Sequence, residues 1–160
     1  MATAEQLNQA IALIQGNQYT DADALLTPLL NQSATDADVW QLVALARKRQ
    51  LDPAGAEVAF KQSIDLHPAP AVVTNLGNLY RQMDREQDAL ACYNRAIEAA
   101  PSHLPARVNK GRSLLALSRL KEATTLYTNI LEELPEHTNA RIGLAQSLHC
   151  LLYTSDAADE

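Results

Sequence analysis

One interval recurs along the chain, and it constrains the fold more than any other feature of the sequence. A small residue, an aromatic residue and a proline each return after 33 or 34 residues. The three series are Ala56, Ala89 and Ala123; Phe60, Tyr93 and Tyr127; and Pro68, Pro101 and Pro135. A chain with such a period is expected to fold as a stack of similar modules, each of which packs on the next.

The stretch 71–101 shows most clearly what one module contains. Small and apolar residues occur at helical spacing in two runs, which predicts a helix, a tight turn and a second helix. The runs are Val73, Leu76, Gly77 and Tyr80, then Ala89, Tyr93 and Ala96. Pro101 ends the second helix because proline lacks a backbone N–H and restricts the residue before it. A single helix pair leaves much of its apolar surface in water, so neighbouring pairs must stack.

The motif Leu-Gly-x-x-Tyr, then Ala-x-x-x-aromatic, then Pro resembles the tetratricopeptide repeat (TPR). This resemblance implies an all-α fold, a right-handed TPR-type α-solenoid of antiparallel helix pairs. We expect repeats over 3–36, 37–69, 70–103 and 104–137, followed by the first helix of a fifth repeat over 138–149. The first repeat is degenerate, as suits the end of an array, and Pro28 is expected to kink its second helix or shift its register.

The last eleven residues, 150–160, do not follow the repeat pattern. They resemble one reading frame of a widely used sequencing adapter, translated at the end of a gene fragment. We therefore expect the TPR array to occupy 1–149, the tail to be non-native and the natural protein to continue beyond His149. Without its three acidic residues, the formal net charge of −6 would become −3.

Composition limits the partners. The acidic net charge argues against nucleic acid, whose phosphates require a clustered basic surface. No apolar run reaches the length of a membrane span, and the N-terminus lacks the pattern of a secretory signal, so we expect no membrane partner and a cytoplasmic location.

No motif for catalysis or cofactor binding is present in the sequence. There is no glycine-rich phosphate loop, no His-Glu-x-x-His and no Gly-x-Ser-x-Gly. The two cysteines are far apart, and His67, His103 and His137 flank the prolines between helices, where capping or a solvated position is favoured over metal binding. We therefore expect no enzyme activity from this fragment, no cofactor and no metal.

The resemblance places the first helix of each repeat on the concave face of the array. Six residues of these helices are predicted to line the groove: Asn75, Asn78, Arg81, Asn109, Arg112 and Gln146. Asn75 and Asn109 stand two residues before the glycine slot, the position where the asparagine-lined superhelix of the N-acetylglucosamine transferase acting on serine and threonine grips peptide backbone. An amide side chain suits this task because it both donates and accepts hydrogen bonds.

The alternative interpretation is that these side chains form a solvated helix surface. The ladder of asparagines is interrupted, since Leu42 and Gly143 occupy the same slot in other repeats. The cationic clamp that some family members use for a carboxylate is not recognisable, because its positions hold Leu7, Gln41, Thr74 and Val108.

Three functions remain open at this stage. The first is a scaffold that binds an extended peptide or a partner helix in the groove. The second is the N-terminal recognition arm of a larger, truncated bacterial enzyme, such as a sulfotransferase or a 2-oxoglutarate-dependent oxygenase. The third is self-association through the unfinished C-terminal repeat.

Overall fold

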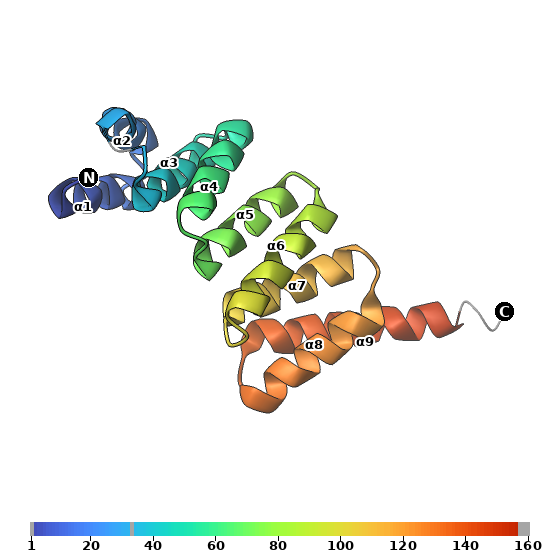
Figure 1. Cartoon of the computed structure of the whole chain (residues 1–160). Helices are drawn as coiled ribbons and strands as arrows, with labels where there is room; N and C mark the ends of the chain where they lie inside the picture. Colours follow the sequence, from blue (N-terminus) through green and yellow to red (C-terminus); the bar gives the residue numbers. More distant parts are fainter. Residues whose placement is uncertain (1, 33, 157–160) are drawn as a thin grey trace. The chain divides into compact units, whose positions relative to one another are not determined.

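The computed structural model describes residues 2–32 and 34–156, and the regular structure within these ranges is entirely α-helical (Figure 1). The described helices are α1 (Ala4–Gln15), α2 (Tyr19–Gln32), α3 (Ala37–Arg49), α4 (Pro53–Leu66), α5 (Pro70–Gln82), α6 (Glu86–Ala99), α7 (Leu104–Ala116), α8 (Leu120–Glu133) and α9 (Thr138–Asp156). The all-α class implied by the resemblance is therefore confirmed.

Local sequence signals explain where several helices begin. Thr3 and Gln6 form a capping box at the start of α1. Asp36 caps the start of α3, where its side chain accepts hydrogen bonds from the backbone N–H groups of Asp38 and Val39. Asp52 accepts from the N–H of Gly55, beside a proline at the first position of α4.

The turns within the first four helix pairs share a left-handed residue. These residues are Asn17, Leu51, Asp84 and Ser118, with φ between 57° and 61°. They follow the 33- and 34-residue period of the sequence, so the same backbone geometry closes each pair. The next position in the series is Leu152, which lies inside α9, so the chain does not turn there.

The chain divides into two compact units, the first of which ends at Leu79. In the first unit α3 packs against α2 and α4. Ala22, Ala56 and Phe60 are completely buried. Arg47, which replaces the usual tyrosine, forms an ion pair with Asp23 of α2, with 3.4 Å between its Nε and the carboxylate oxygen.

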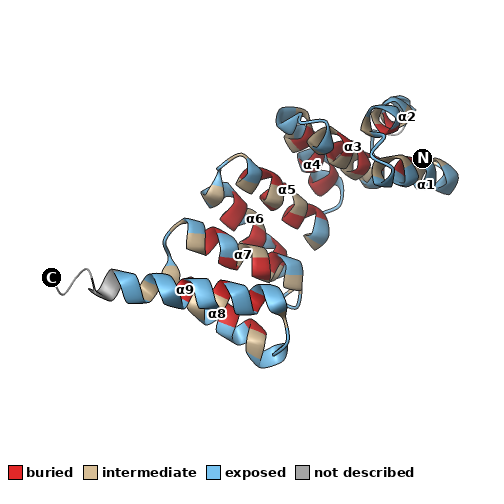
Figure 2. Cartoon of the chain, turned by 180° about the vertical axis from the view of Figure 1, so that it is seen from behind, coloured by how far each residue is buried: buried red, intermediate tan, exposed pale blue. Residues whose placement is uncertain are grey.

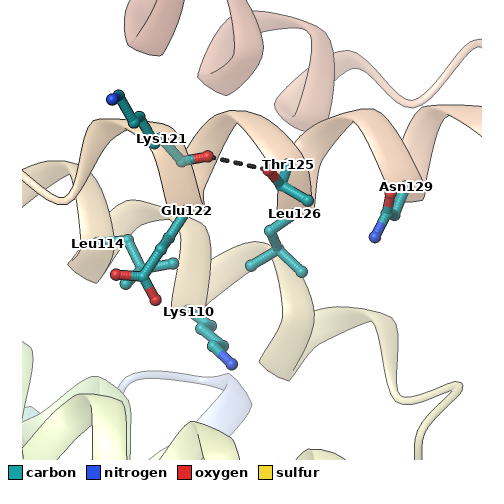
Figure 3. A pocket seen from close by; sticks show the side chains of 7 residues that line it. All are labelled: Lys110, Leu114, Lys121, Glu122, Thr125, Leu126 and Asn129. Carbon is teal, nitrogen blue, oxygen red and sulfur yellow. Dashed lines mark hydrogen bonds between the residues drawn. The ribbon is translucent and has the colours of Figure 1, made fainter.

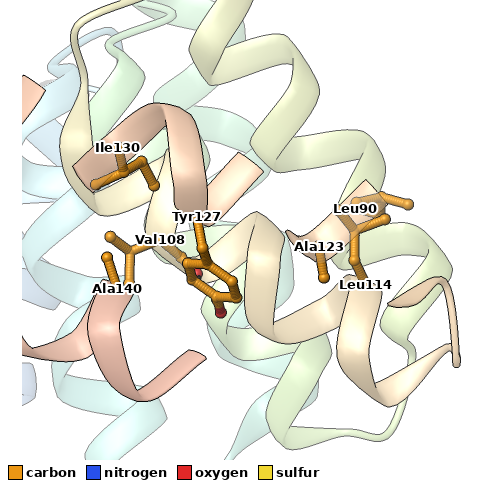
Figure 4. Packing of buried hydrophobic residues seen from close by; sticks show 7 residues of the cluster. All are labelled: Leu90, Val108, Leu114, Ala123, Tyr127, Ile130 and Ala140. Carbon is orange, nitrogen blue, oxygen red and sulfur yellow. Dashed lines mark hydrogen bonds between the residues drawn. The ribbon is translucent and has the colours of Figure 1, made fainter. Parts of the chain in front are cut away.

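The second unit begins at Tyr80 and contains α6 to α9. Its core is formed by Leu90, Val108, Leu114, Ala123, Tyr127, Ile130 and Ala140 (Figure 4). Ala89 and Ala123, predicted to fill the small slot of two successive repeats, are both completely buried. Arg107 of α7 donates two hydrogen bonds, of 2.6 and 2.7 Å, to the carboxylate of Glu133 on α8, and so ties the two helices together.

Three local features bear on what the sequence suggests. α9 continues through His149 to Asp156, so the first seven residues of the predicted tail are helical; residues 157–160 lie outside the described residues. α2 runs through Pro28 to Gln32 as one helix, and the kink or register shift expected at Pro28 stays a prediction. His137 does act as a cap, but at a helix N-terminus: its Nδ1 accepts from the N–H of Ala140 in α9.

Candidate functional site

The six predicted groove residues fall into two sets. Asn75 and Asn78 lie on the part of α5 that belongs to the first unit, and both are half-buried. The other four belong to the second unit and are described together: Arg81 at the end of α5, Asn109 and Arg112 on α7, and Gln146 on α9. Arg112 and Gln146 are exposed, whereas Arg81 and Asn109 are half-buried and less open to solvent than the sequence suggests.

Tyr127 of α8 fixes the distance between the two first helices of this unit. A Cβ atom built on Gly111 of α7 would lie 2.7 Å from the tyrosine hydroxyl, and one built on Gly143 of α9 would lie 2.5 Å from Cε2 of the same ring. Only glycine leaves room for the ring at both positions. This explains why Gly143 interrupts the asparagine ladder: the slot is filled by the tyrosine.

Two buried tyrosines of the second unit, Tyr93 and Tyr127, have raised pKa values. Burial is the main cause of the raised pKa for Tyr93 and for Tyr127. The positive charges of Arg81 and Arg112 act on both phenols and lower each pKa against the effect of burial.

Charge is segregated by helix type in this unit. α7 contains no acidic residue and α9 contains none before Asp156, whereas α6 and α8 carry three each. Those six acids are Glu86, Asp88, Glu98, Glu122, Glu132 and Glu133. The sequence already contains this segregation of charge. It can be recognised only when the structure shows which helices form pairs.

Two cations of the first helices have acidic partners. Arg107 pairs with Glu133, and Arg141 pairs with Glu136 at 3.2 Å. Within the described residues, Arg81, Lys110 and Arg112 form no such ion pair. One nitrogen of Arg81, Nη1, is buried and makes no hydrogen bond to a described residue.

A pocket of about 380 Å³ lies on α7 and α8 (Figure 3). It is lined by Lys110, Leu114, Lys121, Glu122, Thr125, Leu126 and Asn129. Lys110 stands where the repeat pattern has leucine, and it is half-buried there. In Figure 3 its side chain and that of Lys121 point in opposite directions, so the two ammonium groups do not converge on one ligand. None of the six predicted groove residues lines this pocket.

Among the described residues, no three side chains of His, Cys, Asp or Glu gather in a way that could hold a metal ion. None of the described helices has both the length and the apolar character needed to cross a bilayer.

Stacked helix pairs that pack through small and large side chains such as Ala123 and Tyr127 define the class of protein: an all-α solenoid of helical repeats. Residues 72–103 match the family model described as tetratricopeptide repeat. These residues are therefore similar to a tetratricopeptide repeat, and the chain has the fold of a TPR-type α-solenoid. No curated protein matches the chain in sequence.

Several solved structures share the fold. YrrB, described as a TPR protein with an unusual peptide-binding site, superposes with a TM-score of 0.77 at 19% identity, over 91% of this chain and 76% of its own. PilF of Pseudomonas aeruginosa superposes with a TM-score of 0.82 at 15% identity, over 97% of this chain and 71% of its own. The first TPR of Spaghetti, bound to the HSP90 peptide SRMEEVD, superposes with a TM-score of 0.68 at 24% identity, over 72% of this chain and 95% of its own.

Proposed function

We propose that the chain is a protein-interaction scaffold that binds an extended peptide along the first helices of its repeats. The observation that carries this proposal is the surface of α7, where Asn109 and Arg112 lie at i and i+3 on a helix without acidic residues. Two of the similar structures are described as peptide-binding or peptide-bound, which agrees with this function.

Asn109 is the proposed contact to peptide backbone. Its amide can pair with a carbonyl and an N–H of one peptide unit, which would make binding tolerant of the peptide's sequence. Asn75 would play the equivalent part in the preceding repeat, with Asn78 and Gln146 adding polar contacts on α5 and α9. Because Gly143 occupies the position on α9 that corresponds to Asn109, α9 contributes no asparagine to the proposed row of backbone contacts.

Peptide-library capture followed by titration tests this function. Asn109→Ala is expected to weaken a captured peptide by about 1–2 kcal/mol, since a backbone group of the peptide loses its partner. Asn94→Ala is the matched control, because Asn94 is also half-buried but lies on α6, a second helix. Equal affinities for wild type and Asn109→Ala, with unchanged melting curves, would contradict the proposal.

A further inference from the structure

The helix α9 exposes a stripe of apolar side chains on the side opposite the residues that it buries, which are Ala140, Gly143 and Ser147. The α9 stripe consists of Ile142, Ala145, Leu148, His149, Leu152 and Tyr153. Its four large apolar side chains are between 46% and 66% exposed, and Figure 2 shows this face of α9 as largely open to solvent. Such a continuous apolar surface indicates a contact with another helix.

The 34-residue period shows what covers the same positions in the preceding repeat. Ile142 and Leu148 correspond to Val108 and Leu114 of α7. Val108 and Leu114 are only 5% and 1% exposed, and they belong to the core that α7 shares with α8 (Figure 4). The α9 stripe is therefore a surface suited to a second helix, in the place that α8 takes beside α7.

α9 also carries the residue spacing of the helices that cover a first helix. Each of α2, α4, α6 and α8 buries a small residue, a large residue four positions later and a third residue three positions after that. The four sets are Ala22, Leu26 and Leu29; Ala56, Phe60 and Ser63; Ala89, Tyr93 and Ala96; and Ala123, Tyr127 and Ile130. α9 repeats this spacing within its stripe as Ala145, His149 and Leu152. One helix thus has the features of both members of a pair, which is what two copies need to cover each other.

We propose that α9 is a dimerisation helix, which pairs antiparallel with α9 of a second copy so that each takes beside the other the place of α8 beside α7. Such a pair, centred at the level of Ser147, sets Ile142 against Leu152 of the second copy and Ala145 against its His149. This inference is independent of peptide binding and adds a second kind of partner to the chain.

The contact of Ala145 with His149 of the second copy reproduces one that exists within the chain. Ala145 corresponds by the period to Gly111, and Gly111 packs against the ring of Tyr127, the residue whose place in the spacing His149 takes. A Cβ atom on Gly111 would overlap the phenol ring. Imidazole is smaller than phenol, so it leaves room for the methyl group of Ala145.

The charge and size of the α9 stripe favour a second copy over a foreign helix. From Ile142 to Tyr153 the sequence has no Asp, Glu, Lys or Arg, so two copies meet without like-charge repulsion. A charged partner helix would lose hydration there without gaining an ion pair. The symmetric pair buries on the order of 1,000 Å², the lower end for a specific interface, so we expect it to form at micromolar rather than nanomolar concentrations. On α1 the exposed large apolar side chain among the described residues is Ile11, so a head-to-tail assembly has no matching stripe.

Sedimentation equilibrium of the whole chain at a series of concentrations tests the pairing. The wild type should shift from monomer to dimer across the micromolar range. Ile142→Glu and Leu152→Lys should each weaken association about tenfold or more, because each places two unpaired charges in the apolar contact. Val58→Glu is the matched control, since Val58 is an apolar residue of α4 with 55% exposure, and it should leave association unchanged. In dilute solution all three variants should melt like the wild type, because the changed side chains are exposed in the monomer.

A mixture of two variants tests the antiparallel arrangement. Combining Ile142→Glu with Leu152→Lys sets the new acid opposite the new base at one end of the pair and leaves the native contact at the other end. The mixture should therefore associate about tenfold more tightly than either variant alone, and the gain should shrink at high salt. A parallel pair would instead gain most from mixing Ile142→Glu with Ile142→Lys, which serves as the control mixture.

Four results would count against this inference. A wild type that stays monomeric up to about 1 mM would overturn it, and so would a dimer that persists in both charge variants, because its contact would then lie elsewhere. A larger gain in the control mixture would overturn the antiparallel arrangement. If the wild type is monomeric but binds an added peptide of residues 119–134, the stripe accepts a second helix and not α9. Asn109→Ala should leave the dimer intact, so failure of this inference and failure of the proposed peptide binding are separate results.

Discussion

Tyr127 is the residue on which the packing of the second unit depends. Its ring is buried between Gly111 and Gly143, and its hydroxyl donates a long hydrogen bond of 3.5 Å to the carbonyl of Val108. The 34-residue period was enough to predict that this aromatic residue fills a slot beside small residues. The period could not show that the ring touches two glycines from different repeats, because that contact depends on how α7 and α9 stack.

We expect Gly143→Ala to destabilise the protein, although alanine is normally the better helix former. The added methyl group would overlap the Tyr127 ring, and forcing extra volume into a packed core costs about 1–3 kcal/mol. Thermal melts of Gly143→Ala, Tyr127→Leu and the double variant give the coupling between the two sites. Additive effects of the two changes would show that the ring and the glycine do not compete for space.

Unlike Tyr127, Leu51 has a strained backbone conformation and a side chain that is not packed in the core. It adopts a left-handed conformation at φ 61° and is 89% exposed. Leu51→Gly should therefore raise stability by about 0.5–1 kcal/mol, the relief of left-handed strain less the extra entropy of glycine in the unfolded chain. Leu51→Ala is the control and should give no gain, because alanine keeps the Cβ atom. A lower melting temperature for the glycine variant would contradict this account.

At the scale of the helices, the ion pair between α7 and α8 links stability to pH. Arg107 lowers the pKa of the Glu133 carboxyl below its ordinary value, mainly through their hydrogen bonds. A group with a depressed folded-state pKa stabilises the fold above its unfolded pKa, and this contribution is lost as the pH falls through the folded pKa.

Glu133→Gln should therefore lower the melting temperature at neutral pH and have little effect in strong acid, where the wild-type carboxyl is also neutral. The size of the effect is expected to be small, because Glu133 is exposed and screened. Glu132→Gln, a change at the neighbouring exposed acid, serves as the control. A difference between Glu133→Gln and wild type that does not depend on pH would mean that the side chain acts through packing alone.

The C-terminal part of α9 presents apolar side chains to solvent. Leu152 and Tyr153 are each 66% exposed, while Leu151 is half-buried, and Figure 2 shows the neighbouring surface of the helix as largely exposed. The sequence pattern distinguished this segment from the repeats, but it did not predict that the helix continues through it. Continuation is possible because the segment 150–156 contains neither proline nor glycine to end it.

Removing residues 150–160 should change the melting temperature only slightly, because most of the described side chains lost are already exposed. A larger loss is expected when the chain is cut before Gly143, since the packing on Tyr127 is then removed as well. Calorimetry of the two truncated chains measures the difference. If the shorter deletion costs as much as the longer one, Leu151 and its neighbours contribute more to the fold than their exposure suggests.

For the whole molecule, the sequence predicted the helix pairs and their core residues but gave little information about the proposed binding surface. A period fixes which residues face a neighbouring helix, and for that reason Ala89, Ala123 and Tyr127 could be placed in advance. The surface residues do not recur with this period. Gly143 stands at the position of its repeat that corresponds to Asn109, and Arg81 and Arg112 occupy different turns of their helices. Which residues of different helices lie together, such as Tyr127 with Gly111 and Gly143, becomes visible only in three dimensions.

Protection against amide exchange should follow the number of neighbours of each helix. In the second unit α7 packs against α6, α8 and α9, whereas α9 packs against α7 and α8. Hydrogen exchange measured by mass spectrometry should therefore be slowest in α7, faster in α9 and fastest near Leu152 and Tyr153. Uniform protection from α6 to α9 would indicate that the unit opens only as a whole.

The described helices pack only against helices that are one or two places away in the chain. This local packing also affects how quickly the protein can fold. Each such contact closes a short loop, as when Arg107 reaches Glu133 across 26 residues, so little chain entropy is lost before a contact forms. Proteins dominated by local contacts fold in microseconds to milliseconds. A growing chain on the ribosome could therefore form each helix pair soon after it emerges, and the exposed stripe of the last helix made would be covered when the next one arrives.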